Sequence, residues 1–150
     1  IYGEMIWLGT SRGVFIFDSN DSKILRLEDI TTKNFPENFY NVNLICEYNH
    51  IIYMNSEIGI IQFDLIEKEL KVAFSSVIYS NKIVLSMAVN EKFIFLGTTS
   101  GLVKINKNTG FVRDYNFSFL SKINDMLIDR NDLWLGTSVG LVKYKWKRNL

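Results

Sequence analysis

Residues 133–144, which read LWLGTSVGLVKY, decide the fold of this chain because the same pattern occurs four times. The other copies are IWLGTSRGVFIF at residues 6–17, IYMNSEIGIIQF at residues 52–63 and IFLGTTSGLVKI at residues 94–105. The glycine that follows each turn recurs at intervals of 46, 42 and 39 residues. Repeats of this length are typical of the four-stranded blades of a β-propeller.

Each copy predicts a β-hairpin. Its first half is apolar and aromatic, two residues turn the chain after a glycine–threonine pair or its equivalent, and a second glycine opens the next strand. A type I turn followed by a glycine with positive φ fits this spacing, because glycine adopts that conformation without steric cost. The hydroxyl groups of Thr10, Ser56, Thr98 and Thr137 are expected to bond the turn backbone.

Further strands flank the hairpins and complete the blades. Apolar segments precede the last three copies, and more polar segments follow the first three. These additional strands are expected at residues 23–28, 42–48, 69–75, 84–90, 111–117 and 123–129. The sequence therefore predicts an all-β fold with fourteen strands, which is a β-propeller of about three and a half four-stranded antiparallel blades.

The predicted blades form one propeller segment over residues 1–150 and are expected at residues 1–29, 42–75, 84–117 and 123–146. The first blade lacks its first strand and the last lacks its fourth, so we expect the remaining blades of a larger ring as neighbours. The alternative is self-association, in which the acidic half of one copy joins the basic half of another. Residues 1–75 carry 6 basic and 11 acidic residues, whereas residues 76–150 carry 11 basic and 5 acidic residues.

The segment at residues 123–144 closely resembles the two-component regulator propeller repeat, whose signature is an apolar strand, a short polar turn and LWIGTxxGL. The copies that start at Ile6 and Ile94 match well, whereas the second copy has Asn55 in place of the glycine before the turn. The resemblance covers nearly the whole chain. It implies the extracytoplasmic, periplasmic or extracellular, sensor part of a signal-transduction protein, with glycans or oligosaccharides as ligands.

Composition and motifs favour binding over catalysis. The formal net charge of +1 gives no general attraction to nucleic acid. No apolar stretch approaches the roughly 18 residues of a membrane span, so we expect no membrane insertion. His50 is the only histidine, Cys46 is the only cysteine, and no Cys/His cluster has zinc spacing. We therefore predict no catalytic residues, no metal site and no cofactor.

Candidate ligand-binding residues come from one face of the propeller. In propellers, the turns between second and third strands lie on the same face as the connections between blades. Among the variable turn residues, Arg12 and Glu57 are the only charged ones. The long connection at residues 29–41 adds aromatic and amide side chains suited to sugars: Phe35, Phe39, Tyr40, Asn34, Asn38 and Asn41. We predict that Arg12, Tyr40, Asn41 and Glu57 border a ligand site.

The leading functional hypothesis is a non-catalytic ligand-binding or sensory propeller, with a carbohydrate or another small molecule as its ligand. A scaffold that docks a protein partner is the alternative, because a fold alone does not fix a function. A propeller lyase or hydrolase is a third reading. It would require acid–base residues from other blades.

Overall fold

The computed structural model describes residues 5–31, 35–116 and 122–149. In this part of the chain, fourteen strands are joined by turns, one α-helix and two 3-10 helices. The strands are β1 (Met5–Thr10), β2 (Gly13–Asp18), β3 (Lys23–Arg26), β4 (Leu44–Tyr48), β5 (Ile51–Ser56), β6 (Gly59–Asp64), β7 (Leu70–Ser75), β8 (Val84–Val89), β9 (Phe93–Thr98), β10 (Gly101–Asn106), β11 (Val112–Tyr115), β12 (Ile123–Asp129), β13 (Asp132–Thr137) and β14 (Gly140–Tyr144). The helices are α1 (Leu27–Ile30), η1 (Ser76–Tyr79) and η2 (Trp146–Asn149).

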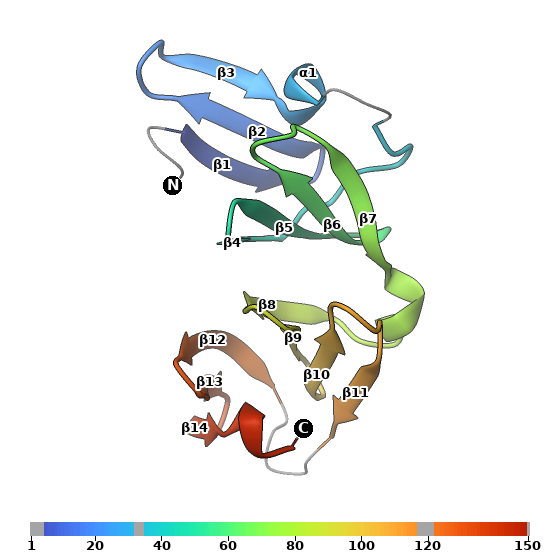
Figure 1. Ribbon diagram of the computed structural model, residues 1–150, viewed down its shortest axis with the longest axis vertical. Coiled ribbons are helices and arrows are strands. Elements are labelled where there is room, and N and C mark those ends of the chain that lie inside the picture. Colours follow the sequence, from blue (N-terminus) through green and yellow to red (C-terminus); the bar gives the residue numbers. More distant parts are fainter. Residues whose placement is uncertain (1–4, 32–34, 117–121, 150) are drawn as a thin grey trace. The chain divides into compact units, whose positions relative to one another are not determined.

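The strands form four antiparallel sheets in which neighbours in sequence are neighbours in space (Figure 1). We call these sheets blade 1 (β1–β3), blade 2 (β4–β7), blade 3 (β8–β11) and blade 4 (β12–β14). The predicted succession of separate sheets, rather than one closed barrel, is confirmed.

The strands expected at residues 42–48, 69–75, 84–90 and 111–117 are shorter than predicted, and they run Leu44–Tyr48, Leu70–Ser75, Val84–Val89 and Val112–Tyr115; residue 117 lies outside the described residues. A further strand end was wrong at a place that bears on the candidate site. The strand predicted at residues 23–28 ends at Arg26, and the chain continues as α1. This short helix buries Leu27, which is 1% exposed. The Asp29 carboxylate accepts a hydrogen bond of 3.1 Å from the backbone N–H of Arg26. Burial of one leucine and capping of one turn therefore stop the strand two residues early.

The hairpin turns have the predicted geometry. The glycines that follow the hairpin turns and open β2, β6, β10 and β14 all have a positive φ, between 105° and 130°. The Thr98 hydroxyl donates a 2.9 Å hydrogen bond to the carbonyl of Gly101 and accepts one of 3.1 Å from the N–H of Ser100. Thr10 and Thr137 make the same pair of bonds. The side chain and the glycine together fix the turn that the sequence predicts.

The chain divides into two compact units, Ile1–Val77 and Ile78–Leu150, each of which has its own core. In the first unit, Val14 and Ile16 of β2 pack with Ile52 and Met54 of β5, all at most 4% exposed. The ring of Trp7 lies 5.5 Å from that of Phe63. Trp7 of blade 1 therefore packs against Phe63 of blade 2.

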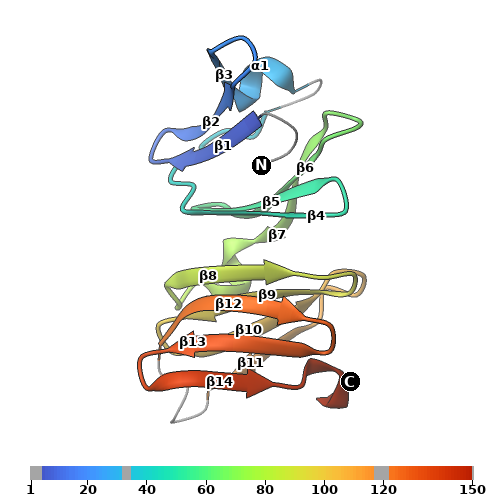
Figure 2. The ribbon, with the colours of Figure 1, turned by 90° about the vertical axis from the view of Figure 1, so that its left-hand side faces the viewer.

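In the second unit, blade 4 covers one face of blade 3, and β12 lies along β8 and β9 (Figure 2). Phe95 and Leu102 of blade 3 share a core with Leu133 and Leu135 of blade 4, and all four are fully buried. The aromatic position of the third copy is thus also packed between blades. Among the described residues, no helix combines the length and the apolar character needed to cross a membrane.

Candidate ligand-binding site

A cavity of about 410 Å³ lies at the turn end of blade 1. Its walls come from the β1–β2 turn, the end of β3 with α1, and the connection to blade 2. The lining residues are Arg12, Gly13, Val14, Arg26, Leu27, Glu28, Phe35, Pro36, Glu37, Asn38, Phe39 and Tyr40. All of them belong to the first compact unit.

The β1–β2 turn presents Arg12 to this cavity. The Thr10 hydroxyl accepts a hydrogen bond of 3.1 Å from the N–H of Arg12 and donates one of 3.0 Å to the carbonyl of Gly13. These bonds fix the backbone but leave the guanidinium exposed. Within the described residues, that guanidinium forms no ion pair.

The connection to blade 2 lies against the same turn, as the propeller topology predicts. The N–H of Asn41 donates to the carbonyl of Ser11 at 3.2 Å, and the N–H of Val42 donates to the carbonyl of Thr10 at 2.9 Å. Phe39 is 2% exposed and anchors the connection in the core, whereas Tyr40 is 51% exposed. The connection therefore places Tyr40, which remains in contact with solvent, among the residues that line the cavity.

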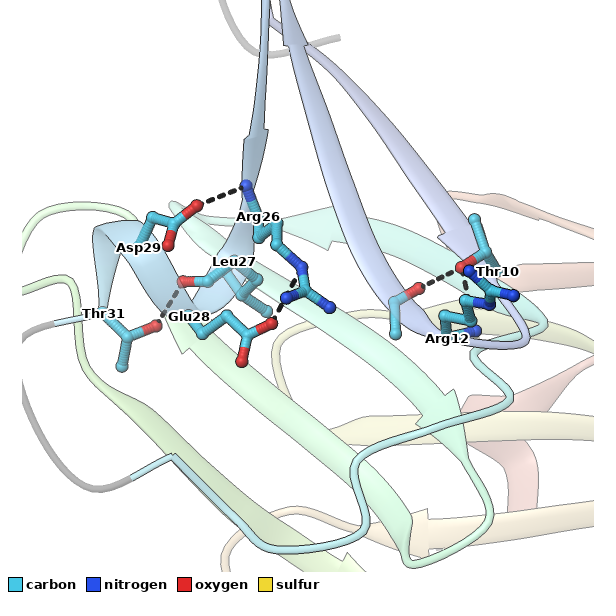
Figure 3. A network of polar contacts seen from close by, with 8 residues as sticks. Thr10, Arg12, Arg26, Leu27, Glu28, Asp29 and Thr31 are labelled. Atoms are coloured by element: carbon cyan, nitrogen blue, oxygen red, sulfur yellow. Dashed lines mark hydrogen bonds and ion pairs between the residues drawn. The ribbon is translucent and has the colours of Figure 1, made fainter.

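The opposite wall carries an ion pair that sequence reasoning missed. Arg26 Nε lies 3.0 Å from Glu28 Oε1, and the Arg26 guanidinium also lies 5.8 Å from the ring centre of Phe15. Figure 3 shows Arg26 between Asp29 and Glu28, with Arg12 at the β1–β2 turn. The helix turn positions these groups, because Glu28 would lie elsewhere if β3 continued in the extended conformation.

The four predicted site residues fall into two pairs. Arg12 and Tyr40 both line the cavity. Asn41 and Glu57 do not line it; the side-chain amide of Asn41 instead donates a hydrogen bond to the Glu57 carboxylate. This pair links the connection to the β5–β6 turn beside the cavity. Asn38 is a lining residue, whereas Asn34 lies outside the described residues.

Polar residues outside the cavity serve the turns. Asp64 Oδ1 accepts hydrogen bonds from the backbone N–H groups of Ile66 at 2.8 Å and Glu67 at 3.0 Å. The bond from Glu67, followed by that from Ile66, lowers the pKa of Asp64 from its ordinary value of 3.8. His50 lies in the β4–β5 turn with φ 64°, and its carbonyl accepts a bond from Leu65. Among the described residues, no group of three or more His, Cys, Asp or Glu is placed to hold a metal ion.

Comparison with solved structures supports the β-propeller fold. The extracellular domain of a proposed one-component system from B. thetaiotaomicron has 18% sequence identity and a TM-score of 0.71, covering 97% of this chain and 20% of that chain. The extracellular domain of a proposed hybrid two-component system from the same organism has 20% identity and a TM-score of 0.63, covering 98% and 19%. The computationally designed Ika4 protein has 12% identity and a TM-score of 0.65, covering 97% and 87%.

These likenesses establish the fold and agree with the resemblance of the repeat to two-component regulator propellers. The chain spans about a fifth of the length of the two regulator domains. No protein-family model matches the sequence, and no curated protein matches it. The fold places Arg12 and Tyr40 at one cavity, and the ligand of that cavity is a separate question.

Proposed function

We propose that this chain is part of an extracellular sensory β-propeller and that the cavity of blade 1 binds a carbohydrate. One observation carries the proposal. The cavity combines an exposed aromatic ring, an arginine without an ion pair among the described residues, and exposed amide and carboxylate groups. Such a mixture suits a ligand that has apolar C–H faces and many hydroxyl groups.

Each element of the cavity has a counterpart in a sugar. The half-exposed ring of Tyr40 offers a flat apolar surface on which a pyranose ring can stack. The Arg12 guanidinium supplies charge-assisted hydrogen bonds to hydroxyl groups or to the carboxylate of an acidic sugar. Asn38 and Glu37, both exposed on the connection, add hydrogen-bonding groups for hydroxyls.

We propose binding rather than hydrolysis because of the setting of the two carboxylates. Glu28 is paired with Arg26 and its side chain is 42% exposed, and Glu37 is also exposed. A glycosidase requires one carboxylic acid that stays protonated in an apolar site next to a second, ionised carboxylate. Neither glutamate of this cavity has the apolar surroundings that such an acid needs.

The sensory part of the proposal draws support from the structural relatives, which are extracellular domains of proposed regulators. A sensor of this kind needs a specific binding surface on a rigid scaffold. The cavity meets this need because a buried core holds its walls, which are a turn, a short helix and a connection, in place. Phe39 and Leu27, at most 2% exposed, anchor two of these walls.

A glycan-array screen of the chain, followed by calorimetric titration of the retained sugar, tests the proposal. We expect Arg12→Ala to weaken binding by about tenfold or more, because a hydrogen bond to a charged group is lost. Tyr40→Ala should weaken it several-fold. The matched control is Arg130→Ala, which removes an exposed arginine from the β12–β13 turn of the second unit. An array without a bound glycan, or equal affinities for all variants, would contradict the proposal.

A further inference from the structure

The connection that carries Tyr40 is anchored in the core on both sides of this residue. Phe39, which precedes Tyr40, and Val42, which follows it, are each 2% exposed and belong to the core of the first unit. Tyr40 and Asn41 lie between these anchors and are exposed. The position of Tyr40 at the cavity therefore depends on what fixes the two exposed residues.

The backbone around Tyr40 has a conformation that residues other than glycine seldom adopt. Asn38 has a φ of 63° and Asn41 a φ of 52°, so both lie in the left-handed region. The N–H of Tyr40 donates a hydrogen bond of 3.0 Å to the carbonyl of Asn38, and that of Asn41 donates one of 3.2 Å to the carbonyl of Ser11. Asparagine tolerates this region better than most residues, but a left-handed residue still needs surrounding contacts to hold it there.

The side chain of Asn41 supplies such a contact on the side of blade 2. Its amide donates a hydrogen bond to the Glu57 carboxylate in the β5–β6 turn. Asn41 thus joins two blades, because its backbone N–H is bonded to the β1–β2 turn. Neither Asn41 nor Glu57 lines the cavity, whereas Tyr40, the neighbour of Asn41 in the chain, does.

The β5–β6 turn is a fixed support for Glu57. The Ser56 hydroxyl donates a hydrogen bond of 3.1 Å to the carbonyl of Gly59, and the N–H of Ser76 donates one of 3.1 Å to the carbonyl of Ile58. Ile58 also packs against the core of the first unit. Because the turn is fixed by its own bonds, Glu57 holds Asn41 in place rather than the reverse.

A link of the same kind occurs at the next connection of the chain. Lys82, which lies just before blade 3, donates a hydrogen bond of 3.1 Å from Nζ to Ser100 Oγ in the β9–β10 turn. Lys82 Nζ also lies 2.9 Å from Asp114 Oδ2 of β11. The chemistry differs from that of Asn41 and Glu57, but in both cases a side chain of the connection is tied to the blade that follows. This shared placement favours a role in holding the connections.

We propose that Glu57 is a positioning residue, which through Asn41 holds the connection in the conformation that forms one wall of the cavity. This role differs from the direct ligand contact that the sequence predicts for Glu57. Where it concerns sugar affinity, the inference rests on the proposed function. The hydrogen bond raises the fraction of molecules in which the wall is already formed, and the apparent dissociation constant falls in inverse proportion to that fraction.

Exchanging donor and acceptor across the pair tests the inference. Glu57→Ala removes the acceptor, Glu57→Gln keeps an acceptor oxygen, and Asn41→Asp places two carboxylates opposite each other. The double variant, Asn41→Asp with Glu57→Gln, restores one donor and one acceptor in reversed order, and aspartate tolerates the left-handed region as asparagine does. The matched control is Glu91→Ala, which removes an exposed glutamate from the β8–β9 turn of the second unit.

Hydrogen exchange of the chain without a sugar is the first measurement. NMR follows the backbone amides of Asn41 and Val42, whose bonds to the β1–β2 turn report whether the connection is in place. We expect Glu57→Ala and Asn41→Asp to speed their exchange by about threefold or more, and Glu57→Gln, the double variant and the control to keep the original rates. The proposal is wrong if Glu57→Ala leaves both amides unchanged, or if the double variant exchanges as fast as Asn41→Asp.

Sugar affinities separate positioning from direct contact. In calorimetric titrations with each glycan that the array retains, Glu57→Ala should weaken all of them by one common factor of about threefold or more, because only the formed fraction changes. Arg12→Ala, which removes a ligand contact, should weaken different glycans by different factors. Unequal factors for Glu57→Ala would overturn the proposal in favour of direct contact. If the array retains no glycan, the proposed function fails, and the exchange rates alone decide the role of Glu57.

Discussion

The pair of substitutions Gly97→Ala and Gly136→Ala separates packing between blades from the local needs of the repeat. Both glycines precede the turn threonine of their blades, both lie in the second compact unit, and neither has a positive φ. Their local sequences are nearly the same, so strand propensity predicts the same small effect at both. The structure predicts opposite effects, because only Gly97 lies under another blade.

The expected magnitudes follow from the contacts. A methyl group on Gly97 would lie 2.2 Å from Ser86 Oγ, 2.7 Å from Ile123 Cγ2 and 3.0 Å from Ile123 Cβ. Ser86 can rotate only by giving up its hydrogen bond to the carbonyl of Ile123, and Ile123 is fully buried. Overpacking of this kind costs about 1–3 kcal/mol. Gly136→Ala meets no atom within 3.6 Å, so we expect it to stabilise the chain by up to about 1 kcal/mol.

Urea unfolding followed by circular dichroism and tryptophan fluorescence measures both free energies of unfolding. A double-mutant cycle adds Ile123→Ala, which removes the clashing Cγ2. We expect Gly97→Ala to cost less in that background, with a coupling energy of roughly 0.5–3 kcal/mol. Equal effects of the two glycine substitutions, or additivity with Ile123→Ala, would refute the account of how blades 3 and 4 pack.

Two further predictions concern the turns. Asp64→Asn should reduce the loss of stability at acid pH. Because the pKa of Asp64 is lowered in the folded protein, the ionised carboxylate stabilises the protein at pH values above the ordinary pKa of 3.8, and this contribution is lost as the pH falls below that value. The turn itself should persist in the variant, because Asn106 accepts the corresponding bonds of its own turn through its amide oxygen. Urea melts between pH 7 and pH 3 that show the same loss of unfolding free energy in the variant and the original protein would contradict the prediction. Thr98→Val should cost about 1–3 kcal/mol, because it leaves buried turn groups without their partner, whereas Thr137→Val at an exposed turn should cost about 1 kcal/mol or less. Thermal and urea melts of the two threonine variants check the order, which equal costs would contradict.

The turns and the sheet order were predictable from sequence because each depends on chemistry within a few residues. A glycine with positive φ and a threonine or serine hydroxyl define the hairpin in each copy, so four copies place the central strands of all four sheets. The position of Trp7 and Phe95 between blades follows from the same alternation of side chains along a strand. Nothing in that reasoning required contacts between distant residues.

The end of β3 was not predictable in this way. The segment that continues from Arg26 reads as a strand because it carries no glycine or proline to stop it. Its conformation is decided by Leu27, which reaches the shared core of blades 1 and 2, and by Asp29 and Thr31, whose side chains bond the backbone of the helix turn. A tertiary contact thus overrides local strand propensity.

In the candidate site, too, some residues were predictable from local sequence and others depended on tertiary contacts. Arg12 and Tyr40 were found from sequence because a charged residue in a variable turn and an aromatic residue in a long connection are visible without coordinates. Arg26 and Glu28 were missed because they join the cavity only through the helix turn. Whether Glu57 would line the cavity or pair with Asn41 depends on the distance between two blades, which no local pattern contains.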